Sequence, residues 1–367
     1  MKDDPYLRWL ISAEIDIVKM HKLLKRFESA RAVFAYAVKG DFRIDDKLIK
    51  CANKLYLEKA NIAGNFEFIS KDSPKYPKRL KQIEYHPIGL FMKGQLPHNF
   101  DTRPVVSIIG SRNNTAYGRR VASDIASALA RVGVIVVSGM AKGLDAYAHD
   151  AALKEQGETI AVLPSGIDVC YPLENEGLYK RIPSCGALVT EFAPGYRPMR
   201  WSFPARNRII SGLSDALVII EAGEKSGTLT TATHAANQGK DVLCVPGSVQ
   251  SPQSVGTNRL IKDGAGLVTN YTDVLVHLKV QRHLKDFFDT DKQLFSGKKD
   301  DFKPDAEKIT LASTQSLVYS CINYEPISIE YIIQKTNLDV ATINKTLLDL
   351  ELSAHIKRLA GNKYARY

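Results

Sequence analysis

Apolar residues recur at helical spacing through the first part of the chain. The stripe begins with Leu7, Leu10 and Ile11, continues past Ile15, and stops near Gly40, where a glycine can end a helix. A second stripe covers residues 48–55. Residues 5–70 are therefore predicted to form a small bundle of short helices, which we assign to residues 1–72.

The pattern changes after Pro104, where short apolar runs begin to alternate with amphipathic stretches. The runs read VVSIIG, VIVVSG, TIAVLPSG, ALVTE, ALVIIEA, DVLCVPG and AGLVTN, and IGLFMKG precedes them as an edge strand. Alternation of this kind predicts βαβ units with helices on both faces of the sheet. We therefore expect an α/β fold over residues 73–282: an extended, Rossmann-like, doubly wound and mostly parallel sheet.

The last part of the chain has a third pattern. Residues 283–306 are rich in charges and weakly periodic, which is typical of a linker. Residues 307–367 then predict a helix, a turn, two further helices and a short hairpin with a turn at Gly361 and Asn362. That order of elements is the pattern of a winged-helix domain.

Composition and charge narrow the function classes. The chain carries 50 Lys and Arg against 40 Asp and Glu, a net charge of +10, which favours a polyanionic partner. Five scattered cysteines without a CxxC pair argue against a disulfide framework or a structural zinc, and no metal or cofactor is expected. Because no signal peptide or long apolar run is evident, we expect a cytoplasmic protein that is not bound to a membrane.

Ligands of an open α/β sheet bind beyond the carboxyl ends of its strands, so the residues that follow each run matter most. Gly110-Ser111-Arg112 follows the first run and offers a hydroxyl and a planar guanidinium to a phosphate, or it is simply a tight turn. Gly139 and Gly143 flank Lys142 after the second run, in a turn suited to an anion. In that turn, Asp145 could equally act as a cap for the next helix.

Later strand ends carry further polar side chains. The third run is followed by Asp168, Tyr171 and Asn175, and the fifth by Ser226 and Thr228, which open a helix. A serine or threonine at that position is more often an N-cap than a ligand.

The segment 193–214 carries arginines and aromatic residues and no acidic residue before Asp215. Its arginines are Arg197, Arg200, Arg206 and Arg208, and Tyr196, Trp201 and Phe203 lie among them. Arginines for phosphates together with aromatics for base stacking are the usual means of holding a single nucleic-acid strand. The alternative is a loop whose aromatics pack inward.

Taken together, these motifs resemble one family, the DNA-processing protein A family (DprA, also called Smf). The motifs GSR, SGMAKGLDAYAH, LPSGID, TEFAPG and the block from Phe203 to Gly247 follow one another in the family's order over residues 76–280. The resemblance also implies an N-terminal domain of the SAM or helix-hairpin-helix kind, and the C-terminal winged helix. It implies a single-stranded DNA-binding protein, commonly a homodimer, that protects incoming DNA and loads RecA recombinase during natural transformation.

Carried over by motif, the resemblance assigns DNA contacts rather than catalytic residues. The residues expected to bind nucleic acid are Ser111, Arg112, Gly139, Lys142, Gly143, Asp168, Tyr171, Asn175, Phe203, Arg206, Asn207, Arg208, Ser226 and Thr228. LPSGID stands where the family usually has a glycine-rich GGGxD, and its extra side chains would narrow the part of the pocket near Asp168.

The alternative is an enzyme. Related Rossmann proteins of the LOG type, which are nucleoside monophosphate phosphoribohydrolases, carry a PGGxGTxxE loop. The corresponding stretch here, AGEKSGTLTTA, keeps Ser-Gly-Thr but lacks PGG and the downstream glutamate. A transcription regulator that uses the winged helix is a third possibility, but its recognition helix at residues 342–352 is poor in basic residues. We therefore expect a binding protein rather than an enzyme.

Overall fold

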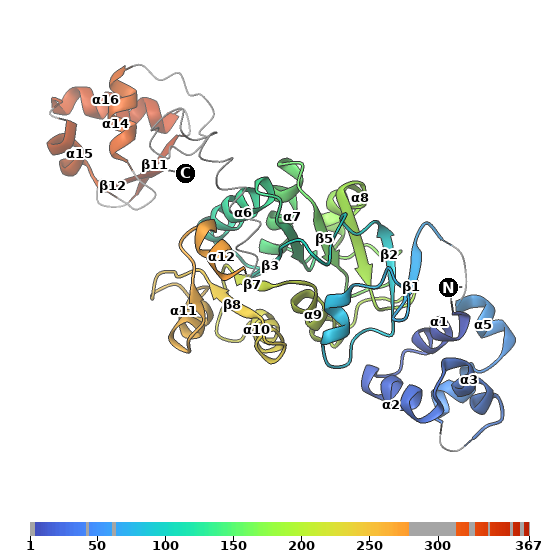
Figure 1. Cartoon of the computed structure of the whole chain (residues 1–367). Helices are drawn as coiled ribbons and strands as arrows, with labels where there is room; N and C mark the ends of the chain where they lie inside the picture. The colour runs from blue at the N-terminus through green and yellow to red at the C-terminus, as the bar shows by residue number, and fades with distance from the viewer. Residues whose placement is uncertain are drawn as a thin grey trace. The chain divides into compact units, whose positions relative to one another are not determined.

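The computed structural model describes residues 4–41, 44–60, 64–278, 313–322, 327–336, 338–352, 355–359 and 363–366. The chain forms two compact units, Met1–Thr290 and Asp291–Tyr367 (Figure 1). The predicted linker at 283–306 lies outside the described residues.

The first unit begins with a cluster of short helices, as the apolar stripes predict. They are α1 (Pro5–Ser12), α2 (Ile17–Phe27), α3 (Ala30–Val38), α4 (Asp46–Cys51) and α5 (Lys54–Ala60). Asp4, Asp16 and Ser29 each accept hydrogen bonds from backbone N–H groups of the first turn that follows them, which fixes where α1–α3 begin. Trp9 is fully buried at the centre, and its Nε1 donates to the carbonyl of Cys51 at 2.9 Å.

A nine-stranded sheet forms the centre of the unit among the residues described. Its strands are β1 (Glu67–Ser70), β2 (Gly89–Gly94), β3 (Val105–Ile109), β4 (Ile135–Ser138), β5 (Thr159–Val162), β6 (Gly186–Thr190), β7 (Ala216–Ile219), β8 (Asp241–Cys244) and β9 (Gly266–Leu267). They lie in the order β1-β2-β6-β5-β4-β3-β7-β8-β9. The strands from β6 to β9 in this order run parallel, while β1 and β2 are antiparallel additions at one edge.

One sequence expectation is wrong at this edge. Residues 67–70 were expected to be helical, but they pair with β2 as a strand. Phe68 contributes to the core shared with the N-terminal helices, where its ring lies 5.0 Å from that of Phe91. The sheet thus starts before the boundary expected at residue 73, and the division at 72 and 73 stays a proposal.

Helices cover both faces of the sheet, as predicted (Figure 1). They are α6 (Ala116–Arg131), α7 (Leu144–Lys154), α8 (Glu176–Cys185), α9 (Ser202–Leu213), α10 (Gly227–Asn237), α11 (Val255–Lys262) and α12 (Tyr271–His277), with short 3-10 helices η1 (Lys78–Gln82) and η2 (Leu173–Asn175). Successive strand residues point to opposite faces, so Val106 packs with α6 and α7 while Val105 packs with η1 and α9. This burial on both faces explains why the strands read as continuous apolar runs.

The strand order reverses at β3. The chain passes from β3 through β4 and β5 to β6 on one side, then crosses over to β7, β8 and β9 on the other. Such a switch point leaves a crevice at the carboxyl ends of the central strands, where the loops diverge. The fold therefore brings the segments after β3, β4 and β7 to the same edge.

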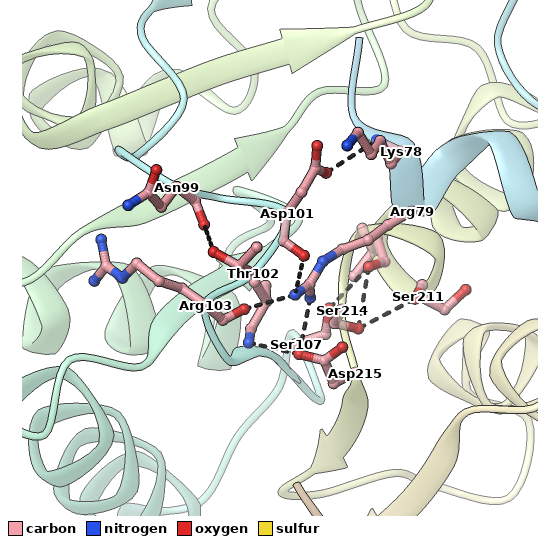
Figure 2. A network of polar contacts seen from close by, with 12 residues as sticks. Lys78, Arg79, Asn99, Asp101, Thr102, Arg103, Ser107, Ser211, Ser214 and Asp215 are labelled. Carbon is pink, nitrogen blue, oxygen red and sulfur yellow. Dashed lines mark hydrogen bonds and ion pairs between the residues drawn. The ribbon is translucent and has the colours of Figure 1, made fainter. Parts of the chain in front are cut away.

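The opposite edge, where β3 and β7 begin, is closed by a network around Arg79 (Figure 2). Nη1 of Arg79 donates to Oδ2 of Asp215 at 2.8 Å, and Nη2 donates to the carbonyl of Arg103 at 2.6 Å. The same Asp215 oxygen accepts the backbone N–H of Val105 at 2.9 Å. The network joins η1 to the first residues of β3 and β7, so it holds the sheet together at this edge.

The second unit is a winged helix. It contains α14 (Ser313–Cys321), β10 (Ile327–Ser328), α15 (Ile329–Thr336), α16 (Val340–Leu352), β11 (Ile356–Leu359) and β12 (Lys363–Arg366). The strands form an antiparallel sheet in the order β10-β12-β11. The predicted order of helices and hairpin is confirmed, while the turn at 361 and 362 lies outside the described residues.

Among the residues described, no helix combines the length and the apolar character that crossing a membrane requires.

Candidate functional site

A cavity of about 580 Å³ opens at the switch point, between the loops after β3 and β7 and the start of α9. Its lining is Ile109, Gly110, Ser111, Arg112, Asn113, Ala141, Asp145, Arg200, Phe203, Pro204, Arg206, Asn207, Ile210, Gly223, Ser226, Gly227, Thr228, Thr231 and Gln253. The lining combines backbone turns, hydroxyls, three side-chain amides, arginines and one carboxylate, with one aromatic ring.

The mouth of the cavity carries an exposed arginine against an aromatic ring. The guanidinium carbon of Arg112 lies 4.8 Å from the centre of the Phe203 ring, which is a cation–π contact. The ring of Tyr171 also contacts Phe203, with the two ring centres 5.8 Å apart. Within the described part of the chain, no carboxylate pairs with Arg112. Its charge is therefore available to a ligand anion.

The turn that presents Arg112 is fixed by close backbone packing. Ser111 Oγ donates to the Asn113 carbonyl at 3.0 Å, and it lies 3.1 Å from Oε1 of Gln253. Gly143 has a φ of +91°, and a Cβ there would lie 2.5 Å from the Ser111 carbonyl oxygen. A glycine is required because any side chain would displace the turn. Gly143 thus supports the Ser111–Arg112 turn from behind and does not line the cavity.

Arg206 forms the floor of the cavity. It is 3% exposed, and its Nη1 donates to the carbonyl oxygens of Gly139 and Val162. Burial lowers the pKa of Arg206 to about 10, although the nearby Asp145 acts in the opposite direction. A Cβ on Gly139 would lie 2.7 Å from both Arg206 Nη2 and Asp145 Oδ2. Gly139 therefore leaves room for this buried pair of charges.

Asp145 does not take the helix-capping role that the sequence allowed: the N-cap of α7 is Gly143, without a side-chain cap hydrogen bond, and Asp145 lies in the first turn of the helix. Its Oδ2 accepts the backbone N–H groups of Gly139 at 3.2 Å and Ala141 at 3.4 Å, so it holds the loop before α7. It also lines the cavity beside Arg206. Burial raises the pKa of Asp145, and the charge of Arg206 opposes that rise.

Arg208 does not reach the cavity. It forms an ion pair with Glu191, and the two side chains are 9% and 10% exposed. The expectation that Arg208 meets DNA beside Arg206 does not agree with this placement. On α9, residues 206 and 208 lie about 200° apart around the helix, so they cannot serve one face together.

Two more predicted residues act on the loops instead of lining the cavity. Asn175 is buried, and its Nδ2 donates to the carbonyls of Met140 at 2.8 Å and Ala141 at 3.2 Å. Asp168 accepts the backbone N–H of Gly195 at 2.7 Å. Lys142 is exposed, with its Nζ 3.9 Å from a carboxylate oxygen of Glu174.

The start of α10 brings Ser226 and Thr228 to the cavity. Ser226 accepts the backbone N–H of Thr228 at 3.2 Å as the N-cap, which is the structural role that the sequence favoured. The first residues of α10, Gly227 and Thr228, line the same cavity, so the positive end of the helix dipole lies there, an arrangement suited to an anion.

Glu221, which directly precedes the AGEKSGTLTTA stretch, is buried and already hydrogen-bonded. Its carboxylate accepts the backbone N–H of Thr115 at 3.0 Å and also the Thr115 hydroxyl. It packs against Gly118, where a Cβ would lie 2.3 Å from its carboxyl carbon. Glu221 therefore fixes the first turn of α6 and does not line the cavity.

The structure brings half of the predicted residues together. Those that line the cavity are Ser111, Arg112, Phe203, Arg206, Asn207, Ser226 and Thr228, and those that do not are Gly139, Lys142, Gly143, Asp168, Tyr171, Asn175 and Arg208. Sequence reasoning missed Asn113, Thr231 and Gln253, and it noted Arg200 only as part of the arginine-rich segment. Gln253 follows β8 in a loop without a motif, so nothing in the sequence indicated it.

The aromatic residues of the segment 193–214 take different positions. Tyr196 is buried and stacks on Phe192, with ring centres 4.7 Å apart, so inward packing is the right interpretation for Tyr196. Phe203 is half-buried at the cavity, and Trp201 is exposed. No metal site accompanies them: within the described ranges, no three His, Cys, Asp or Glu side chains come together.

Comparison with known proteins decides the family. The profile of the DNA recombination-mediator protein A family matches residues 67–279, and that of the DprA winged helix domain matches residues 302–362. The Smf protein of Synechocystis is 31% identical over 98% of each chain. The chain belongs to the DNA recombination-mediator protein A family.

Two experimental structures of DprA proteins have a similar fold. DprA of Streptococcus pneumoniae aligns with a TM-score of 0.66 and 32% identity, covering 76% of this chain and 99% of that one. DprA of Helicobacter pylori, described for its single-stranded DNA binding mode, aligns with a TM-score of 0.53 and 31% identity over 60% and 97% of the two chains. The resemblance that the motifs indicated is confirmed.

Proposed function

We propose that this chain binds single-stranded DNA in the cavity at the carboxyl edge of its sheet. The observation that carries the proposal is Arg112, exposed and without a carboxylate partner in the described residues, lying over the Phe203 ring at the cavity mouth. A guanidinium offers paired donors to a phosphate, and a neighbouring ring offers a surface to a base. The H. pylori relative, described for its single-stranded DNA binding mode, supports the same ligand.

The cavity suits a single strand better than a duplex. Arg112 supplies donors and the α10 N-terminus a positive dipole end around a recess of about 580 Å³, and Phe203 is half-buried beside it. A duplex keeps its bases stacked inside, so it cannot place one against a ring at this depth. We therefore propose phosphate contacts by Arg112 and Ser111 and a base contact by Phe203, with Arg206 and Asn207 at the floor.

We further propose that the protein acts after binding as a mediator, protecting the strand and passing it to RecA recombinase, and that it works as a homodimer. The family to which the chain belongs supports the first part. Two linked cavities would raise the effective concentration of each for a long strand, which supports the second.

We propose a binding role rather than catalysis. Glu221 supports this because both of its carboxylate oxygens hold Thr115 and are not directed at a substrate. A hydrolase of the LOG type would need an acid at the reacting sugar. The protein should release no base from AMP, CMP or single-stranded DNA. Release that is lost in Glu221→Ala would overturn this view.

The test of the binding proposal compares two arginines by anisotropy with a labelled single-stranded oligonucleotide. Arg112→Ala should weaken binding roughly ten- to a hundredfold, because a charge-assisted hydrogen bond contributes about 1.5–3 kcal/mol. Arg112→Lys should recover only part of the loss, since a point charge lacks the planar fork. Arg131→Ala is the matched control, because Arg131 is also exposed but ends α6 near the opposite edge of the sheet. Equal affinity of the Arg112→Ala and Arg131→Ala variants would contradict the proposal.

A further inference from the structure

The chain has two tryptophans in very different surroundings. Trp9 is fully buried, whereas Trp201 is 51% exposed at the residue that precedes α9. The Trp201 ring is held by two neighbours, with centres 5.7 Å from Phe192 and 5.8 Å from Tyr196. Because these contacts already hold the exposed Trp201 ring in place, the ring loses little conformational freedom when a ligand packs on it.

Trp201 stands between two open recesses. Its chain neighbour Arg200 lines the cavity described above, while Trp201 and Arg197 line a separate groove of about 510 Å³. Consecutive residues lie about 3.8 Å apart, so the Arg200–Trp201 pair joins the mouth of the cavity to the groove. Met199, also exposed, lines the groove beside them.

The charges along this path favour a polyanion. Arg197 and Arg200 are exposed, and within the described ranges neither makes an ion pair. With Arg112 they form a series of exposed guanidiniums in which Phe203 and Trp201 are interspersed. That alternation of cations and aromatic rings is the usual surface for a single strand.

The groove also contains acidic residues, but other groups offset their charges. Glu14 lies 3.9 Å from Nζ of Lys47, which also lines the groove. Asp16 accepts the backbone N–H groups of Val18 and Lys19 at the positive end of α2. Lys47 and Arg197 thus balance Glu14 and Asp16 in the groove, and Arg200 and Arg112 add positive charge at the cavity.

We propose that Trp201 is a second stacking platform, on which a base of single-stranded DNA packs after the strand leaves the cavity, with Arg200 and Arg197 holding the adjacent phosphates. The proposal rests on the proposed function, because it extends the path of the same strand toward the N-terminal helices. It gives Trp201, one of the aromatic residues of the segment 193–214, a position on the strand's path outside the cavity.

The experiment uses the fluorescence of Trp201 in the full chain. Stacking of a base on an indole quenches its emission, whereas buried Trp9 supplies a constant background. Adding oligo(dT) should quench the wild-type emission in step with binding measured by anisotropy. The DNA-dependent quench should disappear in Trp201→Phe, which keeps a ring and should lose only a few-fold in affinity. Trp201→Ala should lose about tenfold.

A second variant tests the charge. Arg197→Ala should reduce the steepness of the salt dependence by about 0.7 in log–log slope, as expected for one phosphate contact to a single strand. Arg131→Ala should leave the slope unchanged, as an exposed arginine away from the path. A slope unaltered by Arg197→Ala would overturn the assignment of Arg197.

The outcomes distinguish a failure of the Trp201 platform from a failure of single-strand binding in the cavity. Normal binding without a quench, together with unchanged affinity of Trp201→Ala, would overturn the platform and leave the cavity standing; Trp201 would then belong to a protein contact. A loss of affinity in Trp201→Ala without any quench in the wild type would make Trp201 a structural residue and also overturn the platform. Absence of any single-strand binding would contradict the proposed function itself.

Discussion

Arginine side chains around the cavity divide into an exposed group and a buried group. Arg112 and Arg200 are exposed and reach the cavity, whereas Arg206 and Arg208 are buried and bonded to the protein itself. The exposed group can meet a ligand without a change in the fold. The buried group determines whether α9 and the loops of the cavity keep their positions.

Arg208→Ala should therefore destabilise the protein rather than act through DNA contacts. It would leave the carboxylate of Glu191 buried without its partner, and breaking a buried ion pair typically costs about 3–5 kcal/mol. Chemical unfolding of Arg208→Ala should show this loss, and the exposed variant Arg112→Ala should not. Unchanged stability of Arg208→Ala with weakened DNA binding would contradict this assignment.

Acid should destabilise the fold through His149, which is fully buried in α7. Thr159 Oγ1 donates to the carbonyl of Val136, so it accepts from Nδ1 of His149 at 2.7 Å. Nε2 has no partner among the described residues, and protonating it would place a charge in the core beside Arg206. Burial, followed by the charge of Arg206, lowers the pKa of His149 to about 3.

The sign of the effect follows from linkage. Below pH 6.5, His149 binds a proton in the unfolded chain but stays neutral in the folded chain. The free energy of unfolding therefore decreases as the pH is lowered from 6.5 to about 3. The loss approaches about 1.4 kcal/mol per pH unit well below pH 6.5 and amounts to about 1.6 kcal/mol between pH 6.5 and 5. His149→Asn keeps a donor for Thr159 and cannot titrate, so its free energy of unfolding should fall less steeply over this range. Parallel pH profiles of the two proteins would refute this role of His149.

At the scale of elements, loops after the four strands β3, β4, β7 and β8 line the cavity, and glycines set how closely the loops after β3 and β4 approach. Gly143 lets the loop before α7 touch the carbonyl of Ser111, and Gly139 leaves space for Arg206 and Asp145. The sequence placed these glycines among the ligand-binding residues because two glycines before a helix suit an anion-binding turn and because they match the family's motif. In the structure these glycines do not line the cavity, and instead they position the residues that do.

Gly143→Ala should weaken single-strand binding, because the new Cβ would lie 2.5 Å from the Ser111 carbonyl at a positive φ and would move the Ser111–Arg112 turn. We expect a loss of affinity of about tenfold or more and a lower melting temperature. Gly177→Ala is the control, because nothing lies within 4 Å of its position and it is inside α8. Equal DNA affinity in both variants would show that the turn tolerates displacement.

The whole molecule shows how far the sequence could predict the structure. The parallel sheet was predictable because burial on both faces makes each of its strands a continuous apolar run. Strand β1 was not, since EFIS is four residues long and follows a helical pattern, and its pairing with β2 is a tertiary contact. For the same reason the sequence could not show that Arg206 bonds to Gly139 and Val162 or that Arg208 pairs with Glu191.

Deleting residues 307–367, the winged helix, should weaken single-strand binding by less than about tenfold. The reason is that the residues that line the cavity and its mouth all belong to the first unit. Anisotropy titrations of the full and shortened chains would measure the difference. Complete loss of binding on deletion would place the main DNA site in the winged helix.

The central claim is that the cavity at the carboxyl edge of the sheet holds a single strand. The most direct test titrates the full chain with a single-stranded oligonucleotide and with its duplex at two salt concentrations. The single strand should bind more tightly at both, and its affinity should fall with salt with a log–log slope near −0.7 for each phosphate neutralised. Equal or tighter binding of the duplex would contradict the account.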